Sequence, residues 1–236
     1  MKTELIKRII QDQEIERRRI FEEERIVERD VDKNFFCEML KHPNILTILG
    51  LRRCGKSVLS WLILKDERFG YVNFDDEKLY GLRADDLNAI LKAFYELYGD
   101  IEYIILDEPQ NVRGWELFAN RLRRTKKVII TGSNSKLLSG ELATHLTGRH
   151  VDFILYPFSF REFLRYNRVN LKDINRYAYA TSTEARISKL LLQYIEKGGL
   201  PESYKFGKNI LRSIFSDIIK KDILVRHEIK KVKTME

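Results

Sequence analysis

The feature that most constrains this chain is the stretch from residue 44 to 57, where an apolar run leads into a glycine-containing loop. The run Ile45–Leu49 ends at Gly50, and Gly55–Ser57 follow with the spacing G-x-x-x-x-G-K-S. A loop of this pattern wraps its backbone N–H groups around an anion at a helix N-terminus, where the helix dipole favours negative charge. The pattern therefore predicts a site for nucleotide phosphates.

The residues on either side of this loop have the periodicity that the pattern requires. The apolar run predicts a buried strand, and Lys56–Asp66 predicts the helix that follows it. Gly50 and Gly55 allow backbone angles that a Cβ atom would forbid. We expect Lys56 to reach the β- and γ-phosphates and the Ser57 hydroxyl to bind Mg²⁺. A chance match in a turn would not need this strand and helix.

A second motif follows in Ile101–Glu108, an apolar strand that ends in two adjacent acids. Because the chain begins to turn at the end of a strand, Asp107 and Glu108 can take separate roles. We expect Asp107 to hold Mg²⁺ through water and Glu108 to orient and deprotonate the attacking water. The alternative is an acidic helix cap after a buried strand, which the upstream phosphate-binding pattern disfavours.

Two further positions are candidates for contact with the γ-phosphate. The apolar strand Lys127–Asn134 ends in Ser133 and Asn134, and either side chain could hydrogen-bond the phosphate or the water. Ordinary turn chemistry is the alternative at that strand end. Arg149 precedes the strand Val151–Leu155, and an arginine there could neutralise transition-state charge in its own site or in a neighbour's. A surface arginine without such a role is the alternative.

Composition bounds the class and the compartment. The 236 residues are 44% hydrophobic and 33% charged, and no run approaches the roughly 18 apolar residues of a membrane span. The N-terminus is too charged for a secretory signal, and the two cysteines, Cys37 and Cys54, indicate a reducing interior. We therefore expect a cytoplasmic protein without a membrane partner. Abundant Lys, Arg, Glu and Ile with few Gln are typical of hyperthermophile proteins.

Charge and periodicity suggest three segments. Residues 1–30 are dense in charge of mixed sign and predict a solvated helical extension that packs on the core or on a neighbour. Residues 31–157 form the predicted core, and residues 158–236, beyond Pro157, are predicted to be a helical lid. The net charge of +8 fits an anionic partner, so nucleic acid is a possible partner besides the nucleotide. The mixed charge of residues 1–30 argues against their being a dedicated phosphate-binding arm.

These motifs together resemble the AAA+ group of P-loop ATPases, and more narrowly its archaeal and bacterial AAA-type members. The resemblance rests on Leu51–Ser57, Leu106–Asn111, Thr131–Asn134, Leu146–Arg149 and Pro157–Phe163. It implies an α/β fold with a five-stranded parallel sheet in the order 5-1-4-3-2, helices on both faces and a C-terminal helical lid. The bend at residues 198–201 resembles an element of signal-transducing (STAND-like) ATPases that lies near the nucleotide, which implicates Pro201.

The resemblance implies ATP or ADP as the nucleotide and Mg²⁺ as the metal. The residues expected to contact the nucleotide are Gly50, Leu51, Arg52, Arg53, Cys54, Gly55, Lys56, Ser57, Val58 and Pro201. An Mg²⁺-dependent ATPase is the first functional hypothesis. A nucleotide-gated switch with negligible turnover, which holds a protein partner or a second copy through charged helices, is the second. A DNA-directed motor or loader is the third, and the basic segments Arg121–Arg124 and Lys220–Lys233 motivate it.

Overall fold

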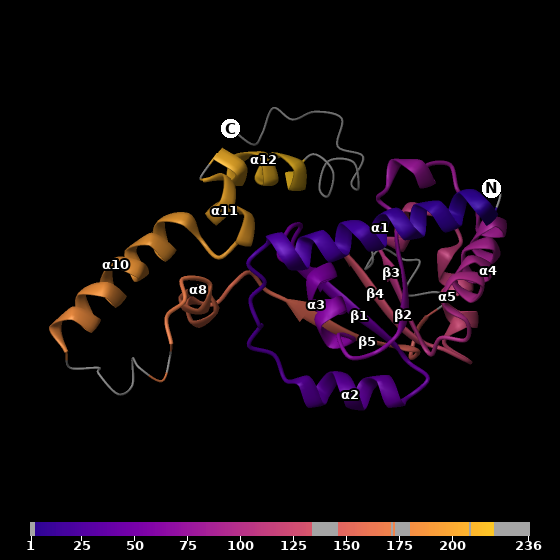
Figure 1. The fold of residues 1–236 in the computed structure, drawn as a ribbon, viewed down its shortest axis with the longest axis horizontal. Coiled ribbons are helices and arrows are strands. Elements are labelled where there is room, and N and C mark those ends of the chain that lie inside the picture. The colour runs from indigo at the N-terminus through magenta and orange to yellow at the C-terminus, as the bar shows by residue number, and fades with distance from the viewer. Residues whose placement is uncertain (1–2, 134–145, 171, 173–179, 208, 220–236) are drawn as a thin grey trace. The chain divides into compact units, whose positions relative to one another are not determined.

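The structure is a computed structural model that describes residues 3–133, 146–170, 172, 180–207 and 209–219 (Figure 1). Its centre is a parallel five-stranded sheet with the strand order β2-β3-β4-β1-β5. The strands are β1 (Ile45–Gly50), β2 (Phe69–Asn73), β3 (Tyr103–Asp107), β4 (Lys127–Ser133) and β5 (His150–Leu155). Read from the other edge, this is the predicted order 5-1-4-3-2, so the predicted fold class is confirmed.

Helices cover both faces of this sheet. All positions of β1 are buried, and so are all but the first positions of β3 and β4, as expected for parallel strands with both faces covered. The α-helices are α1 (Thr3–Glu23), α2 (Lys33–Lys41), α3 (Lys56–Ile63), α4 (Leu87–Tyr98), α5 (Trp115–Leu122), α8 (Phe160–Tyr166), α10 (Thr181–Lys197), α11 (Pro201–Phe206) and α12 (Asn209–Asp217). Short 3₁₀ turns are η1 (Glu77–Leu79), η2 (Ala84–Asp86) and η3 (Pro109–Asn111).

The register of the strands brings the predicted motifs to one edge of the sheet. Gly50, the last residue of β1, pairs with Ser133, the last residue of β4. Asp107, the last residue of β3, pairs with Thr131 on one side and with Asn73 on the other. The carboxyl ends of these four strands therefore lie along a common edge, where ligands bind in open α/β sheets.

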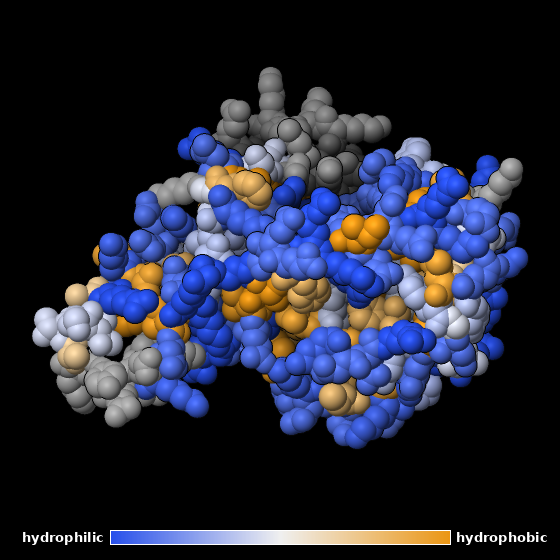
Figure 2. All heavy atoms as spheres, in the orientation of Figure 1, coloured by the Kyte–Doolittle hydropathy of each residue, from blue (hydrophilic) through white to orange (hydrophobic). Residues whose placement is uncertain are grey.

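Helix α1 belongs to the hydrophobic core although most of its residues are charged. Ile6, Ile9 and Ile10 are at most 1% exposed and pack in the main core cluster. Their spacing places them on one stripe of the helix, while the outer surface over α1 is largely hydrophilic (Figure 2). The buried side chain of Gln13 extends this contact, because its amide donates to the Asn73 carbonyl and accepts from the Asn73 N–H. This amide therefore pairs with the free backbone edge of β2.

The chain divides into two compact units. The first unit comprises Met1–Glu24, Asp32–Gly50 and Lys56–Leu155, and the second comprises Arg25–Val31, Leu51–Gly55 and Tyr156–Glu236. The predicted boundaries at residues 30 and 157 stay predictions. Among the described residues, none of the helices has the length and apolar character that crossing a membrane requires.

Three helices of the second unit, α8, α10 and α11, pack around a cluster of their own. Phe163, Leu164, Val169 and Leu190 form its buried centre. Nearby, the Phe158 N–H donates to the Gly199 carbonyl at 2.7 Å, and a Cβ atom on Gly199 would lie 2.4 Å from the Phe158 carbonyl oxygen. Only glycine fits this close approach of two backbone segments.

Candidate functional site

The loop between β1 and α3 has the backbone geometry of a phosphate-binding turn. Arg53 has φ 62° and Gly55 has φ 95°, so both lie in the left-handed region. At Gly55 the backbone angle, rather than a lack of space, disfavours any other residue, since a Cβ atom would lie 3.7 Å from its nearest neighbour. Alternation of left- and right-handed residues turns successive N–H groups to one side, which creates a concavity for anions.

Lys56, the first residue of α3, lies close to Gly50 of the glycine-containing motif and to Glu108 of the acidic motif. Its side chain is only 6% exposed, and its Nζ donates to the Gly50 carbonyl at 3.3 Å. The same Nζ lies 3.9 Å from Oε1 of Glu108. The lysine of the first motif and the glutamate of the second therefore converge, although they are far apart in the sequence.

Asp107 is buried and is held by hydroxyl groups from both neighbouring strands. The Tyr71 hydroxyl donates to Oδ2 at 2.8 Å, and the Thr131 hydroxyl donates to Oδ1. Burial, together with the charge of Asp107, raises the pKa of Tyr71 well above its usual value, so this hydroxyl stays protonated and remains a donor. With one donor on each oxygen, the carboxylate is fixed in position while each oxygen keeps a further lone pair for a ligand.

A cavity of about 260 Å³ opens beside Asp107. It is lined by Gln13, Glu16, Arg17, Ile20, Ser57, Val58, Trp61, Tyr71, Asn73 and Asp107. Ser57, with its hydroxyl, and Asp107, with its carboxylate, thus line the same cavity. One carboxylate with one hydroxyl is a donor set that suits Mg²⁺, which takes oxygen ligands, keeps several waters and shares substrate phosphates. Among the described residues, no group of three or more His, Cys, Asp or Glu side chains forms a metal-binding cluster.

Glu108 adopts a backbone conformation that is unfavourable for its residue type. Its φ of 52° and ψ of 44° are left-handed, although it is not a glycine. Its N–H donates to the Thr131 carbonyl at 2.9 Å, and its carboxylate accepts from the Gln110 amide. Left-handed non-glycine residues cost about 1 to 3 kcal/mol and cluster at functional sites, so this outlier marks Glu108 as a candidate for chemistry.

The two candidates at the end of β4 differ in what the structure says of them. Ser133 is 3% exposed, and its hydroxyl has no hydrogen-bond partner among the residues that the structure describes. Because a buried hydroxyl without a partner is costly, this group is suited to a ligand or a water beside Gly50. Asn134 lies outside the described residues.

The structure does not bring Arg149 to this edge of the sheet. Its carbonyl accepts from the N–H of Ile45, the first residue of β1, and His150 pairs with the same residue. Gly50 instead pairs with Leu155, so Arg149 lies just before the opposite end of β5, about 20 Å from Leu155 along the strand. Contact with the phosphates of its own chain is therefore excluded by this register, and a role in a neighbour's site stays a prediction.

In the second unit, the predicted contact residue Pro201 begins helix α11. Its neighbour Glu202 forms an ion pair with Arg53, with 2.5 Å between Oε2 and Nη1. Arg53 of this loop is thus paired with the residue that follows Pro201. Leu51, Arg52 and Cys54 complete this loop, and Cys54 is fully buried.

One of the two basic segments that motivated a DNA-directed role lies among the described residues, and Arg121 and Arg124 in it are exposed. Arg121 donates to the Asn88 side chain, and Arg123 donates to the carbonyl of Pro43 and to the side chain of Asn120. These two arginines are therefore engaged within the first unit. The segment Lys220–Lys233 lies outside the described residues.

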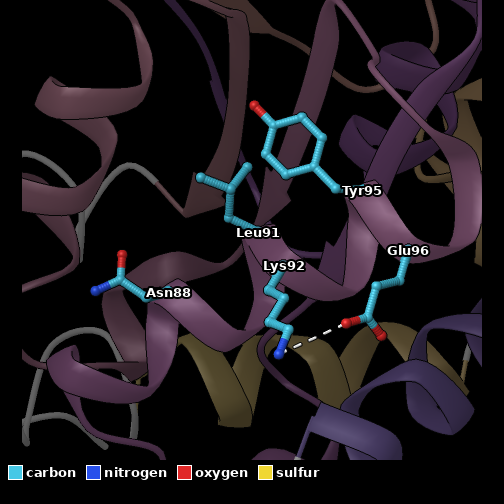
Figure 3. Close-up of a pocket in the computed structure, with 5 residues that line it drawn as sticks. All are labelled: Asn88, Leu91, Lys92, Tyr95 and Glu96. Atoms are coloured by element: carbon cyan, nitrogen blue, oxygen red, sulfur yellow. Dashed lines mark ion pairs between the residues drawn. The ribbon is translucent and has the colours of Figure 1, made fainter.

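A larger but shallower hollow of about 440 Å³ lies on α4 (Figure 3). It is lined by Asn88, Leu91, Lys92, Tyr95 and Glu96. Within it, the Nζ of Lys92 lies 3.7 Å from Oε1 of Glu96. All five residues come from one helix, and none belongs to the motifs above. The cavity beside Asp107 is therefore the candidate site.

Sequence reasoning missed several residues of this site. Tyr71 and Thr131 received no role, although each is a polar side chain in an otherwise apolar strand, which is a usable signal. Gln13 and Arg17 reach the cavity from α1, and no local pattern pointed to them. Their positions depend on how α1 packs on the sheet.

A parallel sheet with this order, in which the lysine of a G-x-x-x-x-G-K-S motif after β1 lies close to the acidic end of β3, defines a P-loop nucleoside triphosphatase. Residues 42–164 of the 236 match the family described as AAA domain. The chain belongs to this family, which confirms the resemblance found in the motifs.

Curated relatives extend the match beyond that region. The chain is 33% identical over 222 residues to an uncharacterized protein of Methanocaldococcus jannaschii, which covers 90% of this chain and 48% of that protein. It is also 33% identical over 201 residues to an uncharacterized protein of Haemophilus influenzae, with 79% and 48% covered. The chain thus spans about half the length of the curated relatives it matches.

Among solved structures, the Walker-type ATPase of Pyrococcus abyssi is similar, with a TM-score of 0.47 and 14% identity, over 86% of this chain and 77% of that chain. A STAND protein with a tetratricopeptide repeat sensor from Pyrococcus horikoshii gives a TM-score of 0.40 and 15% identity, over 74% and 29%.

Proposed function

We propose that this chain binds ATP and hydrolyses it in an Mg²⁺-dependent reaction. The observation that supports the proposal most is the convergence of the two motifs at one edge of the sheet. Lys56 lies 3.9 Å from Glu108, and Ser57 shares a cavity with Asp107. ATP rather than GTP follows from the family resemblance, since the sequence has no Asn-Lys-x-Asp guanine signature.

Each residue has a distinct part in this proposal. The loop N–H groups and Lys56 bind the β- and γ-phosphates, and Ser57 and Asp107 would hold the metal ion. Tyr71 and Thr131 keep the Asp107 carboxylate in one orientation. When bound, Mg²⁺ neutralises charge on the phosphoryl oxygens.

Glu108 takes the proton of the attacking water. The water oxygen forms a bond to the γ-phosphorus, the bond from that phosphorus to the bridging oxygen breaks, and ADP leaves with the electron pair. The hydroxyl of Ser133 is suited to contact the γ-phosphate or the water, because it is buried beside Gly50.

Exchange of Glu108 for glutamine tests the hydrolytic part of the proposal. An amide cannot accept the proton, so Glu108→Gln should lower the rate of phosphate release about 100-fold or more. The affinity for ATP should stay unchanged, because the loop and Lys56 are intact. Phosphate release under multiple-turnover conditions and binding of a fluorescent ATP analogue are the two measurements.

Glu102→Gln is the matched control, since Glu102 is an exposed glutamate just before β3. This variant should behave like the unaltered chain in both measurements. Equal hydrolysis by Glu108→Gln would remove Glu108 from the mechanism. ATP binding with negligible turnover by the unaltered chain would instead favour the nucleotide-gated switch.

We also propose that the second unit responds to the nucleotide as a lid. The ion pair between Arg53 and Glu202 supports this proposal, because it joins the loop to the start of α11. A ligand that shifts the loop would act on this pair directly.

A further inference from the structure

A buried arginine outside the recognised motifs contacts the phosphate-binding loop. Arg29 is 8% exposed and makes three hydrogen bonds within the second unit. Its Nη1 donates to the Cys54 carbonyl at 2.9 Å, its Nη2 to the Tyr156 carbonyl at 2.6 Å, and its Nε to Oε1 of Glu162 at 2.8 Å. The planar guanidinium also lies over the Phe158 ring, 5.0 Å from its centre. One side chain thus joins the loop to the start of α8.

Glu162 in turn is fixed by α8 itself. It is the third residue of a capping box, in which its Oε2 accepts from the Ser159 N–H at 2.8 Å and its own N–H donates to the Ser159 hydroxyl. Its Oε1 also accepts from the Asp30 N–H at 2.7 Å. Burial works to raise the pKa of Glu162, but these hydrogen bonds and the Arg29 charge outweigh burial and lower it, so the carboxylate stays ionised.

The bond to Cys54 matters because of peptide geometry. The peptide between Cys54 and Gly55 is planar and trans, so the Cys54 carbonyl and the Gly55 N–H point in opposite directions. A carbonyl held toward Arg29 therefore leaves the Gly55 N–H directed away from Arg29. Gly55 has φ 95°. Because glycine allows many backbone conformations, this peptide could rotate among several orientations if Arg29 did not hold it.

The charge of Arg29 does not serve as a phosphate ligand in this arrangement. Its guanidinium is paired with the buried Glu162 carboxylate, and each of its two terminal nitrogens donates to a backbone carbonyl. A buried ion pair of this kind is weak evidence for stability by itself, because desolvation offsets the attraction. Its contact with the loop carbonyl gives the pair a role beyond stability.

We propose that Arg29, oriented by Glu162, is a positioning residue that presets the Cys54–Gly55 peptide so that its N–H is presented to a nucleotide phosphate. The inference rests on the proposed nucleotide site. It also implies that phosphate binding at Gly55 is transmitted through Arg29 to the N-terminus of α8.

The test compares nucleotide affinity in two arginine variants of the whole chain. Arg29→Met should weaken binding of fluorescent ADP about tenfold or more, the loss expected for a hydrogen bond to a charged group. Arg29→Lys should also bind more weakly, because a single ammonium cannot serve three acceptors at once. In turnover assays of Arg29→Lys, KM should rise while kcat changes little, a split that a merely structural role would not produce.

Arg165→Met is the matched control. Arg165 also joins α8 to the same preceding segment, through Asp30 and the Glu28 carbonyl, but it is not bonded to the loop. The Arg165→Met variant should be less stable than the unaltered chain but should bind ADP with the same affinity. If Arg29→Met folds and binds ADP as tightly as Arg165→Met, the inference is wrong. If the unaltered chain binds no nucleotide, the proposed function itself fails.

A measurement on the unaltered chain covers the case in which Arg29→Met does not fold. Amide hydrogen exchange with and without ADP should show slower exchange at Asp30 and at Glu162, whose N–H groups belong to this network. Slower exchange confined to residues 50–58, with no change at these two amides, would overturn the inference.

Discussion

At the residue scale, the orientation of Asp107 depends on two strands that flank its own. Tyr71 on β2 and Thr131 on β4 each donate a hydrogen bond to one carboxylate oxygen. Groups that orient a metal-binding carboxylate affect metal affinity nearly as much as the ligand itself. Tyr71 should therefore matter for Mg²⁺ although it would not touch the ion.

We expect Tyr71→Phe to raise the Mg²⁺ concentration that half-saturates hydrolysis, by about tenfold. The ring stays in place against Trp61, and only the hydroxyl that holds Asp107 is lost. A magnesium titration of phosphate release at fixed ATP measures the effect. Tyr103→Phe removes a hydroxyl at the start of β3 and should leave the titration unchanged. Identical titrations for Tyr71→Phe and the unaltered chain would contradict the orienting role.

The sequence predicted motif residues better than the residues that support them. Lys56, Ser57, Asp107 and Glu108 follow from local spacing, because the loop and the strand ends are short contiguous segments. Arg29 could not be predicted in this way, since its partners lie 25, 127 and 133 residues away. Such contacts arise only when distant segments fold together.

At the element scale, α1 combines a charged surface with a narrow apolar stripe. Its sequence predicted helix, but mixed charge could not distinguish packing on the core from packing on a neighbour. The structure shows Ile6, Ile9 and Ile10 in the core and Gln13 against the edge of β2. Three buried isoleucines in a helix of 21 residues are easily overlooked beside so many charges.

Gln13→Ala should destabilise the chain by about 1 to 3 kcal/mol, because the Asn73 backbone would lose both partners at a partly buried site. The midpoint of urea unfolding measures this change. Gln11→Ala is the control, since Gln11 is exposed on the same helix. Equal midpoints for the two variants would show that the amide contributes nothing to the fold.

At the scale of the whole molecule, strand order was the most predictable property. The family resemblance implied the order 5-1-4-3-2, whereas the apolar runs alternating with helical patterns indicate buried parallel strands without fixing which strands are neighbours. The division into two units was less predictable. The second unit includes Arg25–Val31 and Leu51–Gly55, which are far in sequence from Tyr156–Glu236.

Nucleotide binding should stabilise the whole chain by mass action. At 100 times its Kd, ADP should add about 2.7 kcal/mol, which corresponds to a rise in Tm of roughly 5 to 11 °C for a chain of this size. Lys56→Ala should abolish this rise, because it removes the buried ammonium that we propose binds the phosphates. Thermal unfolding with and without ADP is the measurement.

Lys65→Ala serves as the control, since Lys65 is an exposed lysine just after α3. Its Tm should rise with ADP as in the unaltered chain. A full rise in Lys56→Ala would place the nucleotide somewhere other than this loop.

The pairing of Gln13 with Asn73 has a consequence for shortened versions of this protein. Among the described strands β2 lies at one edge of the sheet, and Gln13 of α1 covers the outer backbone of its last residue, Asn73. A version trimmed to begin at residue 31 would uncover this edge together with the apolar surface beneath α1. Such an uncovered border is a template for strand exchange between molecules, so the trimmed protein should precipitate or self-associate rather than behave as a minimal nucleotide-binding domain.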